Sequence, residues 1–430
     1  MIDIVRADGT AEFEAVKKLQ SRNAHADEAV AHTVEEIIND VKENGDAAVR
    51  KYAQKFDGVD EGPKQVPQEE LFNSVNICDK KFVNALRNAI DNITAYHEKQ
   101  APRGFTLTPD NGAVIGQRVR GLHRVGIYVP GGTAAYPSSV LMNAIPAKIA
   151  GVGEIIMVTP PMKDGSANPN ILAAAALAGV DRVFLCGGAQ AVAALAFGTQ
   201  TVPKVDKIVG PGNIYVATAK KLLFGVVDID MIAGPSEILT VADSSADPHF
   251  LAADLLSQAE HDKMASAVLL TTDASIAEKT ASEIEIQLLE LERCEIATRS
   301  IEDYSMIILC DSTDQAIDFA NRIAPEHLEL CISDPFEYIG RIDNAGSVFL
   351  GNYAPEALGD YYAGPNHVLP TSGTARFFSP LGVDSFIKRS SYIYYTRDGL
   401  KAAASDIITL ADCEGLTGHA NSIKVRFEED

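Results

Sequence analysis

The sequence predicts an α/β fold with more than one domain. The chain has 430 residues, and at about 150 residues per domain this length favours two or three packed units. From Arg124 onward, short runs of β-forming residues end in glycine turns and pass into Ala-rich segments, a pattern typical of βαβ units. A second alternation of this kind runs from Asp247 to Leu350. Two α/β domains are the simplest interpretation.

The first hundred residues are expected to be helical. Apolar residues recur at helical spacing from Ala29 to Tyr52 and again from Phe82 to Tyr96, so these helices could cover one face of a sheet. Upstream, Met1 to Ala11 carries acidic residues where a secretory or mitochondrial leader would be basic and then apolar. We therefore expect a cytoplasmic protein, or a plastid protein if a transit peptide has been removed.

Charge and hydrophobicity argue against two classes of partner. The 59 acidic and 37 basic residues leave a net charge of -22. This charge repels polyanions, so binding to nucleic acid or to anionic membranes is not expected. The longest apolar stretches, Ile171 to Val180 and Ala189 to Phe197, are shorter than the roughly 20 residues that span a bilayer. Any anionic ligand must be held by local groups.

Four glycine turns follow predicted strands between residues 124 and 235. They are Pro130-Gly131-Gly132, Cys186-Gly187-Gly188, Gly210-Pro211-Gly212 and Ala233-Gly234-Pro235. At the carboxyl edge of a parallel sheet, such turns let backbone N–H groups approach a phosphate, so this region is a candidate nucleotide site. Any single turn could instead serve chain reversal alone. The usual dinucleotide fingerprint is not met, because Gly151-Val152-Gly153 precedes a predicted strand, Glu154 to Thr159.

The second alternation begins with a capped helix. Asp247 can cap this helix, with Pro248 at its first position. The next strand, helix and strand are expected at Ala267 to Leu270, Ser275 to Leu291 and Met306 to Leu309. Beyond Leu350 the chain has a short helical stretch around Gly399 to Leu410 but too little periodic apolar content for a core. We expect this tail to pack on another part of the protein, for example another subunit.

Possible metal ligands occur in three separate regions. Gln258 and His261 lie three residues apart on one face of a predicted helix, Asp360 lies at a glycine-rich stretch, and His419 lies beside glycine in the tail. Together the four would supply two nitrogens and two oxygens, which suits zinc and tolerates cobalt or manganese. The alternative for the helix is a solvated polar face. Five isolated histidines are expected at helix surfaces, caps or the start of a strand: His25, His32, His97, His123 and His249.

Glu326 and His327 form a candidate acid/base pair. The helix that opens with the Ser312 to Gln315 capping box should end just before them, because Pro325 disfavours helix at the residue it follows. Histidine titrates near neutral pH, and a glutamate with a raised pKa can activate water. A surface turn explains the pair equally well at this level. The pair also precedes the strand Leu328 to Ile332, an edge where ligands are less expected.

Six motifs, spread in order along the chain, resemble histidinol dehydrogenases. They are GIYVPGG at 126–132, GGAQ at 187–190, GPGN at 210–213, DMIAGPSE at 230–237, APEH at 324–327 and GPNH at 364–367. The resemblance implies an NAD-dependent oxidoreductase that uses zinc. Its reaction would be the oxidation of L-histidinol to L-histidine through L-histidinaldehyde, the last step of histidine biosynthesis, with two NAD and one water.

The resemblance also implies roles for individual residues. The metal ligands would be Gln258, His261, Asp360 and His419, and the acid/base pair would be Glu326 and His327. The substrate would be contacted by these four ligands, by His327 and by three further residues, Ser236, His367 and Glu414. NAD would be held at the glycine turns by Tyr128, Gln190 and Asn213.

The fold implied by the resemblance is a pair of incomplete Rossmann-like domains with small N- and C-terminal extensions, in an intertwined homodimer. We expect an N-terminal arm (1–25) and a nucleotide-binding domain (124–235). The metal and acid/base residues would lie in a discontinuous domain (26–123 plus 236–378). A C-terminal extension (379–430) would complete the partner's site.

Two other functions are weighed against this one. A cysteine-dependent aldehyde dehydrogenase would need an activated thiolate. Cys186 beside Gly187 is the best candidate, but no basic partner is apparent nearby. The six cysteines are instead expected to be buried reduced thiols, since no CxxC pair occurs. A nonenzymatic metal-dependent binding protein would keep the ligand set without needing Glu326 and His327.

Overall fold

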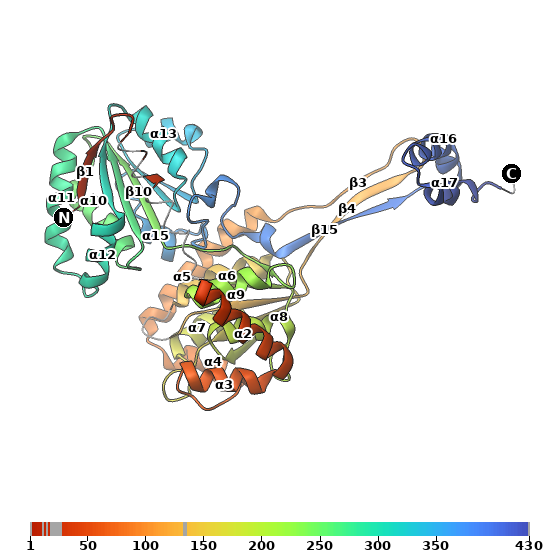
Figure 1. The fold of residues 1–430 in the computed structure, drawn as a ribbon, viewed down its shortest axis with the longest axis horizontal. Helices are drawn as coiled ribbons and strands as arrows, with labels where there is room; N and C mark the ends of the chain where they lie inside the picture. Colours follow the sequence, from red (N-terminus) through yellow and green to blue (C-terminus); the bar gives the residue numbers. More distant parts are fainter. Residues whose placement is uncertain (1, 11–12, 14–15, 18–27, 132–135, 429–430) are drawn as a thin grey trace.

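The computed structural model describes residues 2–10, 13, 16–17, 28–131 and 136–428. Figure 1 shows two α/β lobes and an arm that projects away from them and ends in a pair of helices. Each lobe contains a six-stranded sheet, and the arm contains a three-stranded sheet. No helix in the described ranges is long and apolar enough to cross a membrane. The predicted α/β class is confirmed.

Lobe A, the lower lobe in Figure 1, contains a sheet of strand order β2-β7-β6-β5-β8-β9. Strands β5 to β9 are parallel, and β2 pairs antiparallel with β7. The strands are β2 (Lys64–Gln65), β5 (Arg124–Tyr128), β6 (Glu154–Thr159), β7 (Arg182–Leu185), β8 (Lys207–Val209) and β9 (Asp228–Ile229). The helices that follow β5 to β8 are α6 (Pro137–Ile149), α7 (Pro169–Ala178), α8 (Gly188–Phe197) and α9 (Ile214–Leu223).

Three of the four predicted glycine turns follow the carboxyl ends of β5, β7 and β8, and each leads into a helix. Gly132 lies outside the described residues. The fourth prediction is wrong, since Met231 and Ile232 form no strand. After β9 the chain passes directly into lobe B as β10 (Glu237–Ala242), so the turn at Gly234 connects the two lobes.

Four N-terminal helices also pack on lobe A. They are α2 (Glu28–Asn44), α3 (Asp46–Phe56), α4 (Gln68–Ile77) and α5 (Lys80–His97). Val34 of α2 shares a core with Tyr128, and Ile93 of α5 shares a second core with Val125. The expected grouping of residues 26–123 with 236–378 is therefore wrong for residues 28–97. The apolar faces of these helices show that they cover a sheet, but periodicity does not say which sheet.

Lobe B contains an all-parallel sheet of strand order β1-β12-β11-β10-β13-β14. Besides β10, the strands are β1 (Asp3–Arg6), β11 (Ser266–Thr271), β12 (Met306–Leu309), β13 (His327–Cys331) and β14 (Ser347–Leu350). The segment expected to form an N-terminal arm (1–25) thus begins with β1, an edge strand of this sheet. The helices are α10 (Pro248–Ala259), α11 (Ala274–Leu288), α12 (Cys294–Tyr304), α13 (Thr313–Ile323), α14 (Pro335–Tyr338) and α15 (Glu356–Tyr361).

Both predicted helix caps of lobe B are present. Asp247 accepts a hydrogen bond from the N–H of His249 at 2.9 Å, and the Ser312 hydroxyl accepts one from the N–H of Gln315 at 3.2 Å. Helix α13 ends at Ile323, and its C-cap, Ala324, has a left-handed φ of 54°. The chain therefore turns sharply before Glu326, as the sequence predicted.

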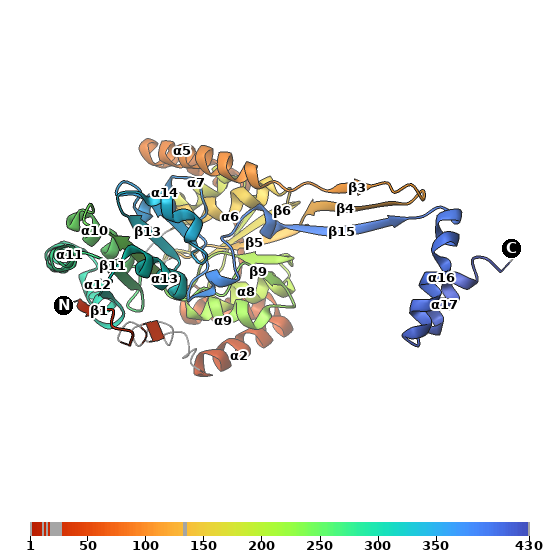
Figure 2. The same cartoon turned by 90° about the horizontal axis from the view of Figure 1, so that it is seen from above.

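The arm consists of β3 (Phe105–Leu107), β4 (Val114–Gly121) and β15 (Ile387–Tyr394), paired antiparallel. At its tip lie α16 (Arg397–Cys413) and α17 (Thr417–Lys424), far from both lobes in Figures 1 and 2. Apolar side chains such as Ile393 and Leu410 are exposed there. The arm therefore has no core of its own, as expected from its composition.

The cysteines are all free thiols, but only three are buried: Cys186, Cys310 and Cys331. Cys78 and Cys294 are partly exposed, and Cys413 is exposed. Burial in particular raises the pKa of Cys186. A thiol of this kind is poorly suited to be the activated nucleophile of an aldehyde dehydrogenase.

Candidate active site

The candidate acid/base pair lies at the amino ends of β10 and β13. His327 opens β13 beside Ile238 of β10, and both members of the pair contact the backbone of Glu237. The N–H of Glu237 donates to Glu326 Oε2 at 2.9 Å, and its carbonyl oxygen lies 3.1 Å from His327 Nδ1. A carbonyl can only accept, so Nδ1 carries the hydrogen and Nε2 is left for another partner.

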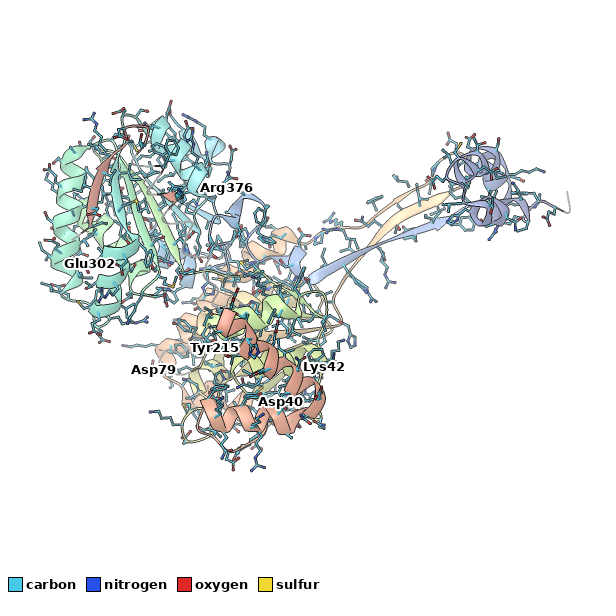
Figure 3. All side chains as sticks on the ribbon, viewed as in Figure 1. Asp40, Lys42, Asp79, Tyr215, Glu302 and Arg376 are labelled. Atoms are coloured by element: carbon cyan, nitrogen blue, oxygen red, sulfur yellow. The ribbon has the colours of Figure 1, made fainter. Side chains whose placement is uncertain are left out.

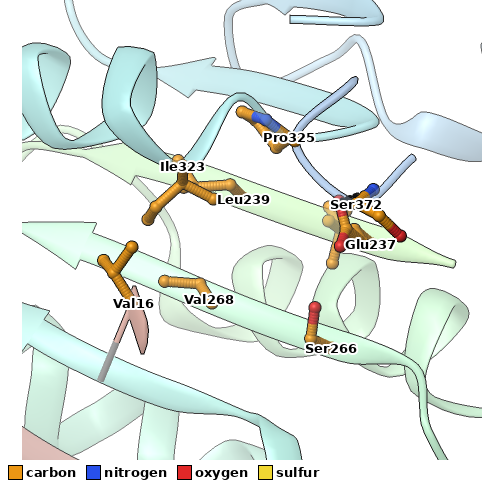
Figure 4. A pocket seen from close by; sticks show the side chains of 10 residues that line it. Val16, Glu237, Leu239, Ser266, Val268, Ile323, Pro325 and Ser372 are labelled. Carbon is orange, nitrogen blue, oxygen red and sulfur yellow. Dashed lines mark hydrogen bonds between the residues drawn. The ribbon is translucent and has the colours of Figure 1, made fainter. Parts of the chain in front are cut away.

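A small cavity lies beside Glu237, and His327 is not among the residues that line it. It measures about 20 Å³ and is lined by Glu237, Ser372, Pro325 and neighbouring apolar side chains (Figure 4). This is room for about one water. The cavity is therefore too small for an amino alcohol.

Two carboxylates face Nε2 of His327. Glu356 Oε1 lies 3.9 Å and Asp360 Oδ1 lies 3.7 Å from this nitrogen, and all three side chains come within reach of one metal ion. Asp360 lies near the end of α15, and the predicted glycine-rich loop follows this helix. His367 follows in that loop, and its Nδ1 donates to the backbone carbonyl of Asp360 at 3.1 Å.

Burial and mutual charge shift the protonation of this group strongly. Burial raises the pKa of Glu326 to about 8, against the opposing charge of His327. Burial disfavours the charged form of His327, but Glu326 and then Asp360 outweigh it and raise the pKa of His327 to about 10. Burial disfavours the charged form of Asp360 too, yet contact with His327 and the charge of His367 lower its pKa to about 2.

Buried polar side chains hold Glu356 in place. Its N–H donates to Glu329 Oε1 at 2.9 Å, and its Oε2 accepts a hydrogen bond from the Ser257 hydroxyl at 2.9 Å. The second oxygen of Glu329 accepts from the Thr240 hydroxyl at 2.9 Å. Neither Glu329 nor Glu356 was predicted from the sequence. The signal that could have found Glu329 is a charged residue inside the apolar run of β13.

Of the two ligands predicted on one helix, Gln258 lies on α10, whereas His261 follows the end of this helix in a turn. Gln258 is 1% exposed, and its Oε1 has no hydrogen-bond partner among the described residues. The same holds for His327 Nε2 and Glu356 Oε1. Burial lowers the pKa of His261, and the charge of Asp360 opposes that shift. His261 therefore lies within electrostatic reach of the cluster. The alternative of a solvated polar face is wrong for this helix.

These unpartnered atoms fit a divalent metal. Buried polar groups are almost always hydrogen-bonded. Here His327 Nε2 and Glu356 Oε1 lie 3.9 Å apart, and Gln258 directly follows Ser257, which bonds Glu356. None of the three unpartnered atoms has a hydrogen-bond partner among the described residues. Amide oxygen, imidazole nitrogen and carboxylate oxygen are ligands that zinc accepts. Of the four ligands predicted from the resemblance, Asp360 belongs to this cluster and His261 lies within electrostatic reach of it.

The two predicted residues of the tail lie elsewhere. Glu414 and His419 belong to the helical tip of the arm, where both are exposed, far from lobe B in Figures 1 and 2. Within one chain they do not join the cluster. Ser236 is half-buried and directly precedes β10, and its carbonyl accepts a hydrogen bond from Ser266.

The loop that carries His367 is tied to lobe A. His97, one of the five histidines expected at helix surfaces, caps or the start of a strand, is fully buried at the end of α5. The amide nitrogen of Asn366 lies 3.4 Å from His97 Nε2 and donates to the carbonyl of Met142 at 2.7 Å. Two residues of lobe A thus hold the segment next to His367.

The three predicted NAD residues lie at the carboxyl edge of the lobe A sheet. The Tyr128 hydroxyl accepts a hydrogen bond from the N–H of Gly188 at 3.0 Å, which joins two of the glycine turns. Gln190 is buried on α8. Asn213 is exposed and caps α9, since its Oδ1 accepts from the N–H of Tyr215; Figure 3 labels Tyr215 on this lobe.

The turn that follows β8 needs glycine at its first position, Gly210. Its φ is +110°, and a Cβ at this position would clash with the carbonyl oxygen of Tyr128. Behind the turn, Lys220 and Asp230 form a buried ion pair. Lys220 Nζ donates to the Gly210 carbonyl at 2.9 Å, and Asp230 accepts the Gly210 N–H at 2.8 Å. The turn is thus held rigidly.

Comparison with known proteins agrees with the motifs. Residues 20–427 match the family described as histidinol dehydrogenase. A histidinol dehydrogenase of Clostridium acetobutylicum is 55% identical with complete coverage of both chains, and one of Listeria innocua is 53% identical over 98% of this chain and 99% of its own. The crystal structure of histidinol dehydrogenase from Elizabethkingia anophelis has a TM-score of 0.93 and 38% identity, with 100% of this chain and 98% of that chain covered. The chain belongs to the histidinol dehydrogenase family.

Proposed function

We propose that this protein oxidises L-histidinol to L-histidine through L-histidinaldehyde, with two NAD and one water, as the last step of histidine biosynthesis. The observation that supports this most directly is the buried Glu326–His327 pair beside unpartnered ligand atoms of Gln258 and Glu356. Such a site can hold an amino alcohol and exchange protons with it. The reaction class follows from membership of the family.

His327 is the proton acceptor in both oxidation steps. Its Nδ1 is occupied by the Glu237 carbonyl, so Nε2 takes the proton of the substrate hydroxyl while hydride leaves the same carbon. Glu326, whose carboxyl is held by the N–H of Glu237, then assists the addition of water to the aldehyde. The resulting diol gives up its second hydride as His327 again accepts a proton. NAD, when bound at the glycine turns near Tyr128, Gln190 and Asn213, supplies the hydride acceptor.

A zinc ion would be held by Gln258, His261 and Asp360, with His419 supplied by the second subunit. Bound there, zinc would anchor the imidazole and amine of histidinol and so orient the alcohol carbon. Ser236, His367 and Glu414 would complete the substrate pocket. A positive charge near Asp360 would also offset the carboxylates that raise the pKa of His327. The pKa of His327 would then fall toward neutral pH.

The arm supports a homodimer in which each tail completes the other subunit's site. Glu414 and His419 are exposed at a tip that lies away from both lobes of its own chain. An exposed arm with apolar side chains is suited to packing on a second copy. We propose that this dimer works in the cytoplasm, without nucleic acid or membrane as partners.

One assay tests the proposal. Metal-depleted protein is mixed with histidinol and NAD, zinc is added back, and NADH is followed by absorbance. We expect two NADH per histidinol, and only after zinc is added. A nonenzymatic metal-dependent binding protein would bind histidinol in calorimetry but produce no NADH, and that outcome would reject the enzymatic function.

A further inference from the structure

Helix α3 carries Asp57 to the carboxyl edge of the lobe A sheet. At its start, Asp46 accepts a hydrogen bond from the Thr201 hydroxyl at 2.6 Å, and Thr201 follows the C-terminal end of α8. Helix α8 begins at the carboxyl end of β7, so its far end and Asp46 lie at the opposite edge. From there, helix α3 runs back toward the carboxyl edge for 11 residues, at about 1.5 Å per residue, and ends at its C-cap, Asp57. Asp57 therefore lies at the edge where the glycine turns are.

One carboxylate oxygen of Asp57 is buried without a partner. Among the described residues, Oδ2 has no hydrogen bond, and burial raises the pKa of this carboxyl. Besides burial, the charge of Asp57 contributes to the raised pKa values of Tyr128 and Cys186. The carboxylate is thus within electrostatic reach of the carboxyl ends of β5 and β7.

The basic side chains near Asp57 in sequence are engaged elsewhere. Lys51 pairs with Asp40 of α2 at 2.6 Å, and Figure 3 labels Asp40 on that helix. Lys55 lies over the ring of Phe56, 5.2 Å from its centroid. Within the described ranges no ion pair reaches Asp57. A ligand that approaches Asp57 therefore meets negative charge.

Two more buried polar atoms lack partners at the same edge: Thr159 Oγ1 and Gln190 Oε1. Both residues are 1% exposed. Thr159 ends β6 and its Oγ1 lies next to Gly131, whereas Gln190 is near the start of α8 and its Oε1 lies next to Gly188. Three acceptors without donors, grouped around glycine turns, fit a ligand that supplies hydroxyl or amide donors.

We propose that Asp57 selects NAD over its 2′-phosphorylated form, NADP, by accepting a hydrogen bond from the adenosine ribose. This inference rests on the proposed function, because it concerns the dinucleotide of that reaction. A carboxylate accepts the ribose hydroxyls of NAD, whereas NADP-binding sites offer an arginine to the 2′-phosphate. A phosphate at that position has no hydroxyl to donate, and its charge repels a carboxylate.

The test compares Asp57→Asn with a matched control, Asp60→Asn. Asp60 lies three residues further on, and its carboxylate is exposed and paired with Arg50 at 3.0 Å. The kcat/KM values for NAD and NADP are measured with histidinol as substrate. We expect Asp57→Asn to raise the NADP-to-NAD ratio by about tenfold or more, the equivalent of one hydrogen bond to a charged group. Asp60→Asn should leave the ratio unchanged.

An unchanged ratio in Asp57→Asn, or an equal shift in Asp60→Asn, would overturn the inference. A second measurement needs no variant: NAD that lacks the adenosine 2′-hydroxyl should bind the unaltered zinc enzyme about tenfold more weakly than NAD. Equal affinity would also overturn it. If histidinol reduces neither dinucleotide, the proposed function fails. The same binding measurement, made on Asp57→Asn as well as on the unaltered chain, then still decides whether Asp57 selects NAD.

Discussion

His327 Nδ1 and Glu326 Oε2 are both bonded to the backbone of Glu237, at 3.1 Å and 2.9 Å. One peptide segment at the start of β10 thus orients the two groups that we assign to proton transfer. Backbone contacts of this kind do not depend on which side chain occupies position 237. They leave His327 Nε2 and the remaining Glu326 oxygen for substrate and water.

The division of roles between Glu326 and His327 can be tested with the two half-reactions. His327→Asn should slow oxidation of both histidinol and histidinaldehyde, because the same nitrogen accepts a proton in each step. Glu326→Gln should slow the aldehyde step more, because only that step adds water. Losses of about 10² to 10⁴ are expected for removing a general base. Equal losses in the two half-reactions for both variants would contradict the split.

Metal removal should abolish activity without unfolding the chain. The proposed ligands include no thiolate, and the cores of both lobes are built from apolar side chains that need no metal. Dialysis against a chelator should leave the far-ultraviolet circular dichroism unchanged, and zinc should restore turnover. Full turnover by protein shown to contain no metal would reject this assignment.

Glu356 is expected to position His327 and Asp360. Replacement by Gln keeps the shape and removes one of the carboxylate charges that raise the pKa of His327. The pKa of His327 in metal-free protein, followed by NMR, should fall, and kcat should drop about 10- to 100-fold, as for other groups that orient ligands. Glu337→Gln, the same change on the exposed helix α14, is the control. A normal kcat with an unchanged His327 pKa would show that Glu356 has no such role.

Glu329 should make the stability of the metal-free protein fall with rising pH. Burial, and then the charge of Asp254, raises the pKa of Glu329 to about 8. The folded chain therefore binds this proton more tightly than the unfolded chain, and the stabilisation is lost as the pH rises from about 4.3 toward 8. In urea unfolding between pH 5 and 8, Glu329→Gln should lose less stability than the unaltered chain. If the stability of Glu329→Gln and of the unaltered chain changed with pH in parallel, this prediction would be contradicted. The control is Glu278→Gln on the exposed face of α11.

The shared site can be tested by mixing inactive subunits. His261→Ala removes a ligand from lobe B, and His419→Ala removes one from the tip of the arm. Mixed dimers should regain about a quarter to half of the normal activity, because one of their two sites has both histidines intact. No recovery in dimers whose mixed composition is verified would show that each chain completes its own site.

Much of the site could be predicted because short-range chemistry is visible in sequence. The cap at Ser312, the helix end at Ile323 and the three turns after β5, β7 and β8 were all placed correctly. Glu356 was missed because nothing in its neighbourhood indicates that α15 packs against α10. His97 was misplaced because its helix buries that face against a distant loop.

By itself, the sequence determined the α/β class, the order of strands and helices, and the family through its motifs, since local propensity and motif spacing depend on neighbouring residues. Only the tertiary structure decided that residues 28–97 pack on lobe A and that Glu356 and Glu329 join the cluster. It also decided that His419 lies far from Asp360 in its own chain. All of these are contacts between residues that are distant in sequence. Such contacts are determined by which segment buries which partner, and this choice leaves no periodic signal in either segment.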